Sequence, residues 1–236
     1  MKANYRFALG LAACLLCYPA TAQVVVYDDM APSDWSSAYP IAVTSVGSPS
    51  DEVGDEIDLA PSTPRTLTGL TIQYLAQNLD SSNDIRVRLY QNDGPLSANA
   101  GAPTPQTVLY DSGNLPLGTL NGRGTLALNN LSVPVPDTLI WTVQFTGLTA
   151  NKVAGLAISG DANPGSSFDD FWEKVNGAWD IYTLPSQYTS NFGAQFTASA
   201  IPEPNATVSV MLGMAFLSVM GLRFVRAAGH ILSADA

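Results

Sequence analysis

The chain has 236 residues and a formal net charge of −10 at pH 7, with 20 acidic residues against 10 basic ones. Such an acidic chain repels nucleic acid and anionic lipid surfaces, so we expect no nucleic-acid partner. One histidine and two cysteines also leave little material for Ser/His or Cys/His catalysis, or for a zinc site of nitrogen and sulfur ligands.

Residues 1–22 have the three parts of a secretory signal peptide. Lys2 and Arg6 precede an apolar run over residues 7–16, and the small-x-small sequence Ala20-Thr21-Ala22 precedes Gln23. We therefore predict that signal peptidase cleaves between Ala22 and Gln23.

An alternative for the same segment is lipidation of Cys14, because Leu11-Ala12-Ala13-Cys14 fits the lipobox pattern. The apolar stretch before Cys14 would be very short, which favours cleavage after Ala22. That cleavage removes Cys14 and Cys17, so the mature chain has no disulfide although its destination is oxidising. Its stability must then come from packing, with or without a bound cation.

Residues 23–200 follow, and a length of about 180 residues suits one domain with a sizeable core. Between Gln23 and Pro204 lie 19 acidic but only six basic residues. Neutral polysaccharide and divalent cations are therefore better candidate partners than polyanions. Solubility outside the cell is the simpler explanation of the acidity.

Short alternating apolar runs, broken by Gly, Pro, Asn and Asp, fill this segment and predict an all-β domain. Because side chains alternate between faces, Arg86 and Arg88 should lie on the face opposite Ile85, Val87 and Leu89. Further runs are Leu70, Ile72, Tyr74; Leu139, Trp141, Val143, Phe145; Ala154, Leu156, Ile158; and Phe192, Ala194, Phe196. About ten strands with this spacing predict a single antiparallel β-sandwich, jelly-roll-like, with an exposed loop from Pro95 to Pro105.

The best-specified hairpin turns at Asn176-Gly177, where Asn-Gly supplies the positive φ values of a type I′ turn. This turn predicts three cross-strand pairs: Trp172 with Ile181, Lys174 with Trp179, and Glu173 with Asp180. The last pair opposes two carboxylates, which is unfavourable. Either the register shifts, or the pair lies at a water-exposed end, or the two share a cation.

Two acidic clusters are candidate calcium sites, because calcium takes several hard oxygen ligands. Residues 51–58 contain five carboxylates beside Gly54, and we take Asp51, Asp55 and Asp58 as candidate ligands. Asp161 with Asp169-Asp170 forms a weaker group. Neither has EF-hand spacing, and the simpler interpretation of residues 51–58 is a solvated acidic strand, in which Asp55 points away from Glu56.

Aromatic residues gather late in the domain and could stack on sugars, although tryptophans in a sandwich are more often core. They are Phe168, Phe171, Trp172, Trp179, Tyr182 and Tyr188. The only histidine, His230, follows the last apolar segment, and no spacing selects a carboxylate pair for glycoside hydrolysis. We therefore expect no enzyme activity.

The C-terminal part, residues 201–226, begins with Ile201-Pro202-Glu203-Pro204, where the prolines favour an extended, accessible chain. Residues 206–222 are uncharged and as a helix span about 25 Å, near the lower limit for crossing a membrane. Arg223 and Arg226 follow, so the rule that positive charge stays inside puts residues 227–236 in the cytoplasm as a tail. One transmembrane helix is therefore predicted.

This order, Pro202-Glu203-Pro204, then one apolar segment, then Arg223 and Arg226, resembles the PEP-CTERM sorting signal of exopolysaccharide-producing Gram-negative bacteria. The resemblance implies that an exosortase, an integral membrane cysteine protease-like enzyme, cuts near Pro-Glu-Pro after transient anchoring in the inner membrane. An ordinary single-pass anchor with a proline-containing linker is the alternative.

The domain also resembles, more loosely, those of PEP-CTERM proteins, in residues 54–59, 86–94 and 108–113. The two resemblances together imply an exported protein of the cell surface or extracellular matrix, associated with exopolysaccharide or biofilm. The alternative is a carbohydrate-binding module, with or without calcium to stabilise it.

Overall fold

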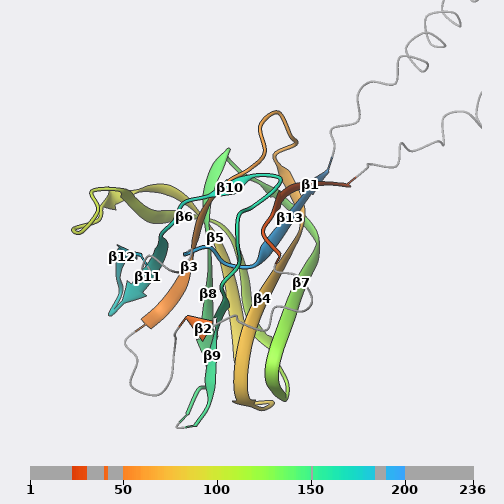
Figure 1. Cartoon of the computed structure of the whole chain (residues 1–236), viewed down its shortest axis with the longest axis vertical. Coiled ribbons are helices and arrows are strands. Elements are labelled where there is room, and N and C mark those ends of the chain that lie inside the picture. The colour runs from red at the N-terminus through yellow and green to blue at the C-terminus, as the bar shows by residue number, and fades with distance from the viewer. Residues whose placement is uncertain (1–22, 31–39, 42–49, 150, 184–189, 200–236) are drawn as a thin grey trace, which may run out of the picture. The chain divides into compact units, whose positions relative to one another are not determined.

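The computed structural model describes residues 23–30, 40–41, 50–149, 151–183 and 190–199. All of them belong to one compact unit, Ala22–Ala200. Every regular element among them is a β-strand, and together they form two antiparallel sheets, so the prediction of an all-β sandwich is confirmed (Figure 1). None of these residues forms a helix long and apolar enough to cross a membrane, and the predicted transmembrane segment lies outside them.

The first sheet, sheet A, has six strands in the order β1-β13-β4-β9-β2, with β7 also paired to β4. Its strands are β1 (Gln23–Asp28), β2 (Pro40–Ile41), β4 (Thr66–Leu79), β7 (Leu120–Pro134), β9 (Val153–Ala157) and β13 (Ala194–Ser199). Because β7 pairs with β4 along its whole length, β13 and β9 share the opposite edge of β4, one after the other.

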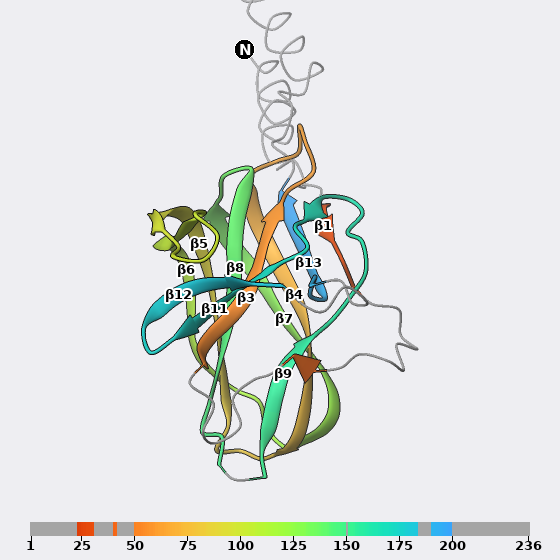
Figure 2. The same cartoon turned by 60° about the vertical axis from the view of Figure 1, so that its left-hand side comes forward.

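The second sheet, sheet B, has seven strands in the order β12-β11-β3-β8-β5-β6, with β10 paired to β3. Its strands are β3 (Ser50–Asp58), β5 (Asp84–Leu96), β6 (Pro103–Pro116), β8 (Thr138–Thr146), β10 (Ser166–Ser167), β11 (Phe171–Val175) and β12 (Ala178–Tyr182). The β5–β6 and β11–β12 hairpins extend from the same side of the molecule, on the left in both views (Figures 1 and 2).

The core lies between the sheets and follows the predicted alternation. Ile85, Val87 and Leu89 are fully buried, whereas Arg86 and Arg88 occupy the other face of β5. The apolar runs of β4, β8, β9 and β13 supply most of the remaining core. On β8 the outer face is buried as well, since Ile140 packs in a second, smaller cluster with Tyr90 and Trp172.

The β11–β12 hairpin has the predicted register, with Trp172 opposite Ile181, Lys174 opposite Trp179 and Glu173 opposite Asp180. Its turn residues have the positive φ values that Asn-Gly was expected to supply, 52° at Asn176 and 83° at Gly177. The opposed carboxylates do not shift the register. Asp180 instead accepts a hydrogen bond from Asn99 Nδ2, on the loop between β5 and β6.

The predicted loop from Pro95 to Pro105 is wrong in its bounds. Strand β5 continues to Leu96 and β6 begins at Pro103, so the connection covers only residues 97–102. Three hydrogen bonds keep the strands together on both sides of Pro95: Thr107 N and Oγ1 donate to Asp93, at 2.9 and 2.6 Å, and Ser97 N donates to the Ala102 carbonyl at 2.8 Å.

Candidate functional site

The two ends of the described domain meet in sheet A. Strand β1 begins at Gln23, the residue that follows the predicted signal cleavage, and Gln23 is the register partner of Ser199 at the end of β13. The other predicted processing and sorting residues lie outside the described part of the chain: Ala22, Pro202, Glu203, Pro204, Arg223 and Arg226.

The structure separates the predicted calcium ligands of residues 51–58. Asp55 is fully buried and lies on the core face of β3, between Val53 and Ile57. Asp58 lies on the opposite face and accepts a hydrogen bond from Thr138 Oγ1. The side chain of Asp51 lies outside the described residues. Asp55 and Asp58 therefore do not come together. The simpler interpretation, a solvated acidic strand, is wrong for Asp55, because this side chain is buried.

Asp55 instead belongs to a buried acidic cluster, which we define as Asp29, Asp55 and Asp170 with Tyr27 and Ser167. The Ser167 hydroxyl donates to the Asp55 carboxylate, 3.0 Å from each oxygen, and the Phe192 backbone N–H donates to Oδ2 at 3.3 Å. Sequence reasoning found Asp55 and Asp170 but missed the others. The two-residue spacing of Tyr27 and Asp29, which puts both on one face of an extended chain, is a signal for these two but not for Ser167.

The carboxyls of this cluster are poorly solvated. Burial raises the pKa of Asp55 well above its ordinary value, and the charges of Asp29 and Asp170 raise it further. Burial also raises the pKa of Asp29 to about 7, against opposing hydrogen bonds from the Ser159 side chain and the Gly160 backbone. Burial and the neighbouring Asp169 raise the pKa of Asp170. These shifts follow from taking charged groups out of water.

Several oxygens of the cluster lack hydrogen bonds. Asp29 Oδ2, Asp170 Oδ1 and the Tyr27 hydroxyl are buried without a partner among the described residues. The Ser167 hydroxyl lies near Tyr27 but already donates to Asp55. Within the described ranges, no group of three or more His, Cys, Asp or Glu side chains stands ready to hold a metal ion.

The weaker predicted group, Asp161 with Asp169 and Asp170, lies on the segment that leads from β9 into β11. Asp170 is half-buried, whereas Asp161 and Asp169 are exposed. Asp169 Oδ1 accepts from the Ser190 backbone N–H at 2.8 Å, which ties this segment to the start of residues 190–199. Asp161 acts on Asp29 through its charge.

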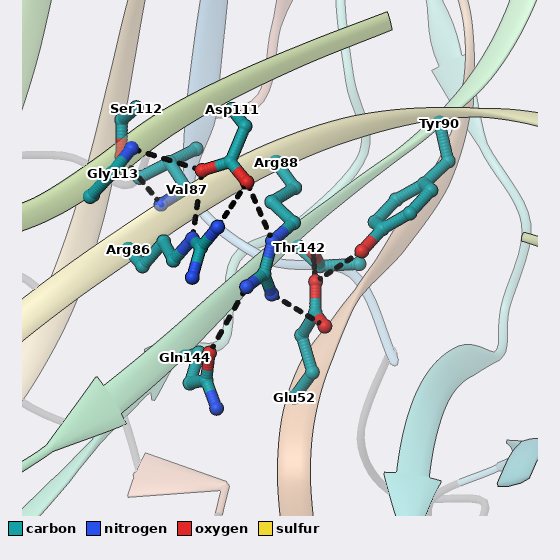
Figure 3. A network of polar contacts seen from close by, with 10 residues as sticks. All are labelled: Glu52, Arg86, Val87, Arg88, Tyr90, Asp111, Ser112, Gly113, Thr142 and Gln144. Atoms are coloured by element: carbon teal, nitrogen blue, oxygen red, sulfur yellow. Dashed lines mark hydrogen bonds and ion pairs between the residues drawn. The ribbon is translucent and has the colours of Figure 1, made fainter. Parts of the chain in front are cut away.

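A second polar centre occupies the outer face of sheet B (Figure 3). Glu52 is only 3 % exposed, and it forms an ion pair of 2.7 Å between its Oε2 and Arg88 Nη1. Its Oε1 accepts from the Tyr90 hydroxyl at 3.0 Å and from Thr142 Oγ1. Arg88 also donates from Nε to Asp111 at 3.2 Å.

Asp111 is the second carboxylate of this network. Arg86 donates to it from Nε at 2.7 Å and from Nη2 at 2.5 Å, which lowers the pKa of Asp111 below its ordinary value. Arg88 Nη2 also contacts Gln144 Oε1 at 3.3 Å. Two arginines thus balance two carboxylates across strands β3, β5, β6 and β8. Because each of these four side chains is paired, the network stabilises the sheet and offers no free group for acid or base catalysis.

Most of the aromatic residues that could stack on sugars are packed within the domain. Trp172 is fully buried, and Phe171 is nearly so. Trp179 packs edge-on against Tyr90, with Lys174 Nζ 5.3 Å from the centre of its ring. Only Phe168 and Tyr182 are exposed, at 45 % and 37 %, and Tyr188 lies outside the described residues. The five described residues do not form one exposed stacking platform.

An open pocket of about 660 Å³ lies between residues 58–65, Asp137 and residues 165–166. Its wall is polar. Arg65 pairs through Nε with Asp137 Oδ1 at 2.6 Å, and it donates to the Thr63 and Ala60 carbonyls at 2.9 and 3.1 Å. Arg65 therefore fixes the connection between β3 and β4.

In comparisons with protein-family models, with curated proteins and with solved structures, this chain has no match. The fold and the two polar centres define an all-β protein of two antiparallel sheets, with a paired charge network outside and an acidic cluster inside.

Proposed function

We propose that residues 23–200 form the jelly-roll-like domain of an exported surface or extracellular-matrix protein that an exosortase sorts through Pro202-Glu203-Pro204. Signal peptidase removes residues 1–22. Residues 206–222 then hold the chain in the inner membrane, with Arg223 and Arg226 at the cytoplasmic side. Cleavage near Pro-Glu-Pro releases the domain toward the cell surface or matrix, where it associates with exopolysaccharide or biofilm.

One observation carries this proposal: Gln23 and Ser199 are register partners in neighbouring strands. The folded domain begins at the residue after the predicted signal cleavage and ends three residues before Pro202. Cleavage at both positions would therefore remove none of the described strands. Gln23 and Ser199 also lie at the same end of sheet A, so release of the domain requires no rearrangement of its strands.

Cysteine placement gives further support. Cys14 and Cys17 precede Gln23, and the described strands of the sandwich contain no cysteine. A domain that folds by packing alone loses nothing when its signal peptide carries both cysteines away.

The test is the fate of a Glu203→Ala variant in the producing cell. If Pro-Glu-Pro is the recognition element, this variant should stay in the membrane fraction as a species about 3 kDa heavier than the released form, which lacks roughly 32 residues. Asp235→Ala is the matched control, because it removes a carboxylate beyond the basic flank and should be released normally. Normal release of Glu203→Ala would contradict the proposal.

A second candidate function is carbohydrate binding, and the polar side chains in the pocket beside Arg65 and Asp137 favour it. Side chains of this kind, carboxylate, guanidinium and hydroxyl, are those that fix the hydroxyls of a small polar ligand. Binding of the full chain to the host exopolysaccharide in a pull-down should weaken at least tenfold in Asp137→Ala. Equal binding by Asp137→Ala and by the wild type would exclude this pocket.

A further inference from the structure

We propose that the buried acidic cluster is a calcium site, with the carboxylates of Asp29 and Asp55 as its charged ligands. The two belong to different sheets, since Asp29 directly follows β1 of sheet A and Asp55 lies in β3 of sheet B. An ion between them would fasten one sheet to the other. That is the role a disulfide plays in many exported domains, and the sandwich has no cysteine to form one.

The first argument is uncompensated charge. Asp55 is fully buried and Asp29 is 4 % exposed, yet no ion pair between described residues includes either of them. The guanidiniums of Arg65, Arg86 and Arg88 are paired with other carboxylates. Buried carboxylates without a cationic partner are strongly unfavourable, so a bound cation would relieve the native state.

The second argument is the set of oxygens left without hydrogen bonds. Tyr27 is fully buried, and its hydroxyl has no partner among the described residues, nor has Asp29 Oδ2. Both belong to residues near Asp55, since the charge of Asp55 raises the pKa of Tyr27 and the charge of Asp29 raises the pKa of Asp55. Buried polar atoms almost always have partners. Water could supply hydrogen bonds to these oxygens, but only a cation would also neutralise the negative charge of the carboxylates.

The chemistry of the cluster selects the ion. Its side chains offer carboxylate and hydroxyl oxygens and no nitrogen or sulfur, which suits a hard cation rather than zinc. Because the described residues hold no ready group of three acidic ligands, backbone carbonyls, hydroxyls or water must complete the shell. Calcium accepts six to eight such ligands in irregular geometry, whereas magnesium demands a near-ideal octahedron.

This site differs from the one predicted at Asp51, Asp55 and Asp58, because it shares only Asp55 with it. Asp170 adds a third negative charge that acts on Asp55. Asp161 and Asp28 act on Asp29 in the same way. Their summed field favours a divalent over a monovalent ion.

The experiment uses the full chain, purified in a mild detergent and freed of metal with a chelator. Thermal unfolding is followed by the fluorescence of its tryptophans, of which Trp141 and Trp172 are fully buried. Calcium at about a hundredfold over its dissociation constant should raise the midpoint by about 5–10 °C. Magnesium at the same concentration should not. Terbium, an ion of similar size, should luminesce through Tyr27 and Trp141, and calcium should displace it.

Asp29→Asn and Asp55→Asn keep the size of each side chain and remove its charge. Both should abolish the calcium-dependent shift and weaken terbium binding at least tenfold, and Asp29→Asn should be at least as stable as the wild type in chelator. Asp84→Asn, which removes a carboxylate at the start of β5, is the control and should behave as the wild type does.

Three results would overturn the proposal. The first is a wild-type midpoint that is equal in calcium and chelator, without terbium luminescence. The second is a calcium shift that survives in Asp29→Asn. The third is a domain that acid stabilises and calcium does not, because protons would then neutralise the cluster. If Asp55→Asn does not fold, the proposal is still tested by terbium binding to the wild type and by the calcium-dependent midpoint shift of Asp29→Asn.

Discussion

Trp172 on β11 is the register partner of Gly54 on β3, and it packs in one cluster with Ile140 on β8 and Tyr90 on β5. The indole Nε1 donates to Glu56 Oε2 at 3.2 Å. A Cβ at Gly54 would lie only 1.8 Å from the Trp141 carbonyl oxygen. The close approach of β3 and β8 therefore depends on the missing side chain.

We predict that Gly54→Ala destabilises the domain by about 3 kcal/mol, because the methyl group meets backbone that cannot move without separating two strands. Urea unfolding monitored by tryptophan fluorescence measures this change. Gly160→Ala is the matched control, since nothing lies within 4 Å of the added Cβ, and its effect should stay within about 0.5 kcal/mol. A stability of Gly54→Ala equal to that of the control would contradict the packing.

The ion pair between Glu52 and Arg88 leads to a second prediction. Arg88→Met should cost about 3–5 kcal/mol, because it leaves the 3 % exposed Glu52 buried without its cation. The double variant Glu52→Gln with Arg88→Met should recover most of the loss. Asp137→Asn breaks an exposed pair and should cost about 1 kcal/mol or less. An equal loss of unfolding free energy in the single and the double variant would show that the unpaired charge of Glu52 is not the cause of the destabilisation.

Acid should stabilise the domain in chelator, because the carboxyl of Asp29 has its pKa raised from 3.8 to about 7. The native state holds this proton where the unfolded chain has released it, so stability is greatest below the unfolded value and falls as pH rises toward 7. The slope per proton is at most about 1.4 kcal/mol per pH unit. The lowered pKa of Asp111 has the opposite effect, but at more acidic pH.

Melting the wild type and Asp29→Asn in chelator, from about pH 4.5 to about pH 8, checks this prediction. The wild-type midpoint should fall as the pH rises. The midpoint of Asp29→Asn should fall less steeply, because this variant lacks the proton bound by Asp29, but it should still fall, because the pKa of Asp55 remains raised. A wild-type midpoint that rises across this range would show that the cluster is not buried in its protonated form.

The boundary of the domain can be tested by truncation. A chain that ends at Gly193 lacks β13, which lies between β1 and β4 and buries Ala194, Phe196 and Ala198. This chain should not fold, because β1 loses its partner strand and Phe196 alone contributes roughly 3 kcal/mol or more. A chain that ends at Ala200 should unfold cooperatively, with the midpoint of the full chain. Cooperative unfolding of the shorter chain would place the boundary elsewhere.

Much of this fold could be predicted from the sequence, because apolar and polar residues alternate along each strand and so show which side chains face the core. The burial of Ile85 and Val87 beside outward arginines, and the register around Asn176-Gly177, follow from local rules of side-chain direction and turn geometry. Both are present in the structure. The short connection at residues 97–102 was missed, because the strands stay together on both sides of Pro95: Asp93 accepts from Thr107 before the proline, and the Ser97 backbone N–H donates to the Ala102 carbonyl after it.

The acidic cluster could not be predicted in full for a different reason. Alternation alone puts Asp55 on the same face as Val53 and Ile57, but an aspartate in an acidic run is expected in water. Its environment comes from Tyr27 and Ser167, which are distant in the sequence and reach it only through the pairing of β10 with β3 and the stacking of sheet A on sheet B. No local sequence pattern specifies these long-range contacts with Asp55.

The most direct test of the proposed export and sorting is the intact mass of the protein released by the producing cell. The released species should begin at Gln23, or its pyroglutamate form, and should end close to Pro202-Glu203-Pro204, so that all strands from β1 to β13 are retained. A released species that extends to Ala236, or one that carries lipid on Cys14, would contradict this account.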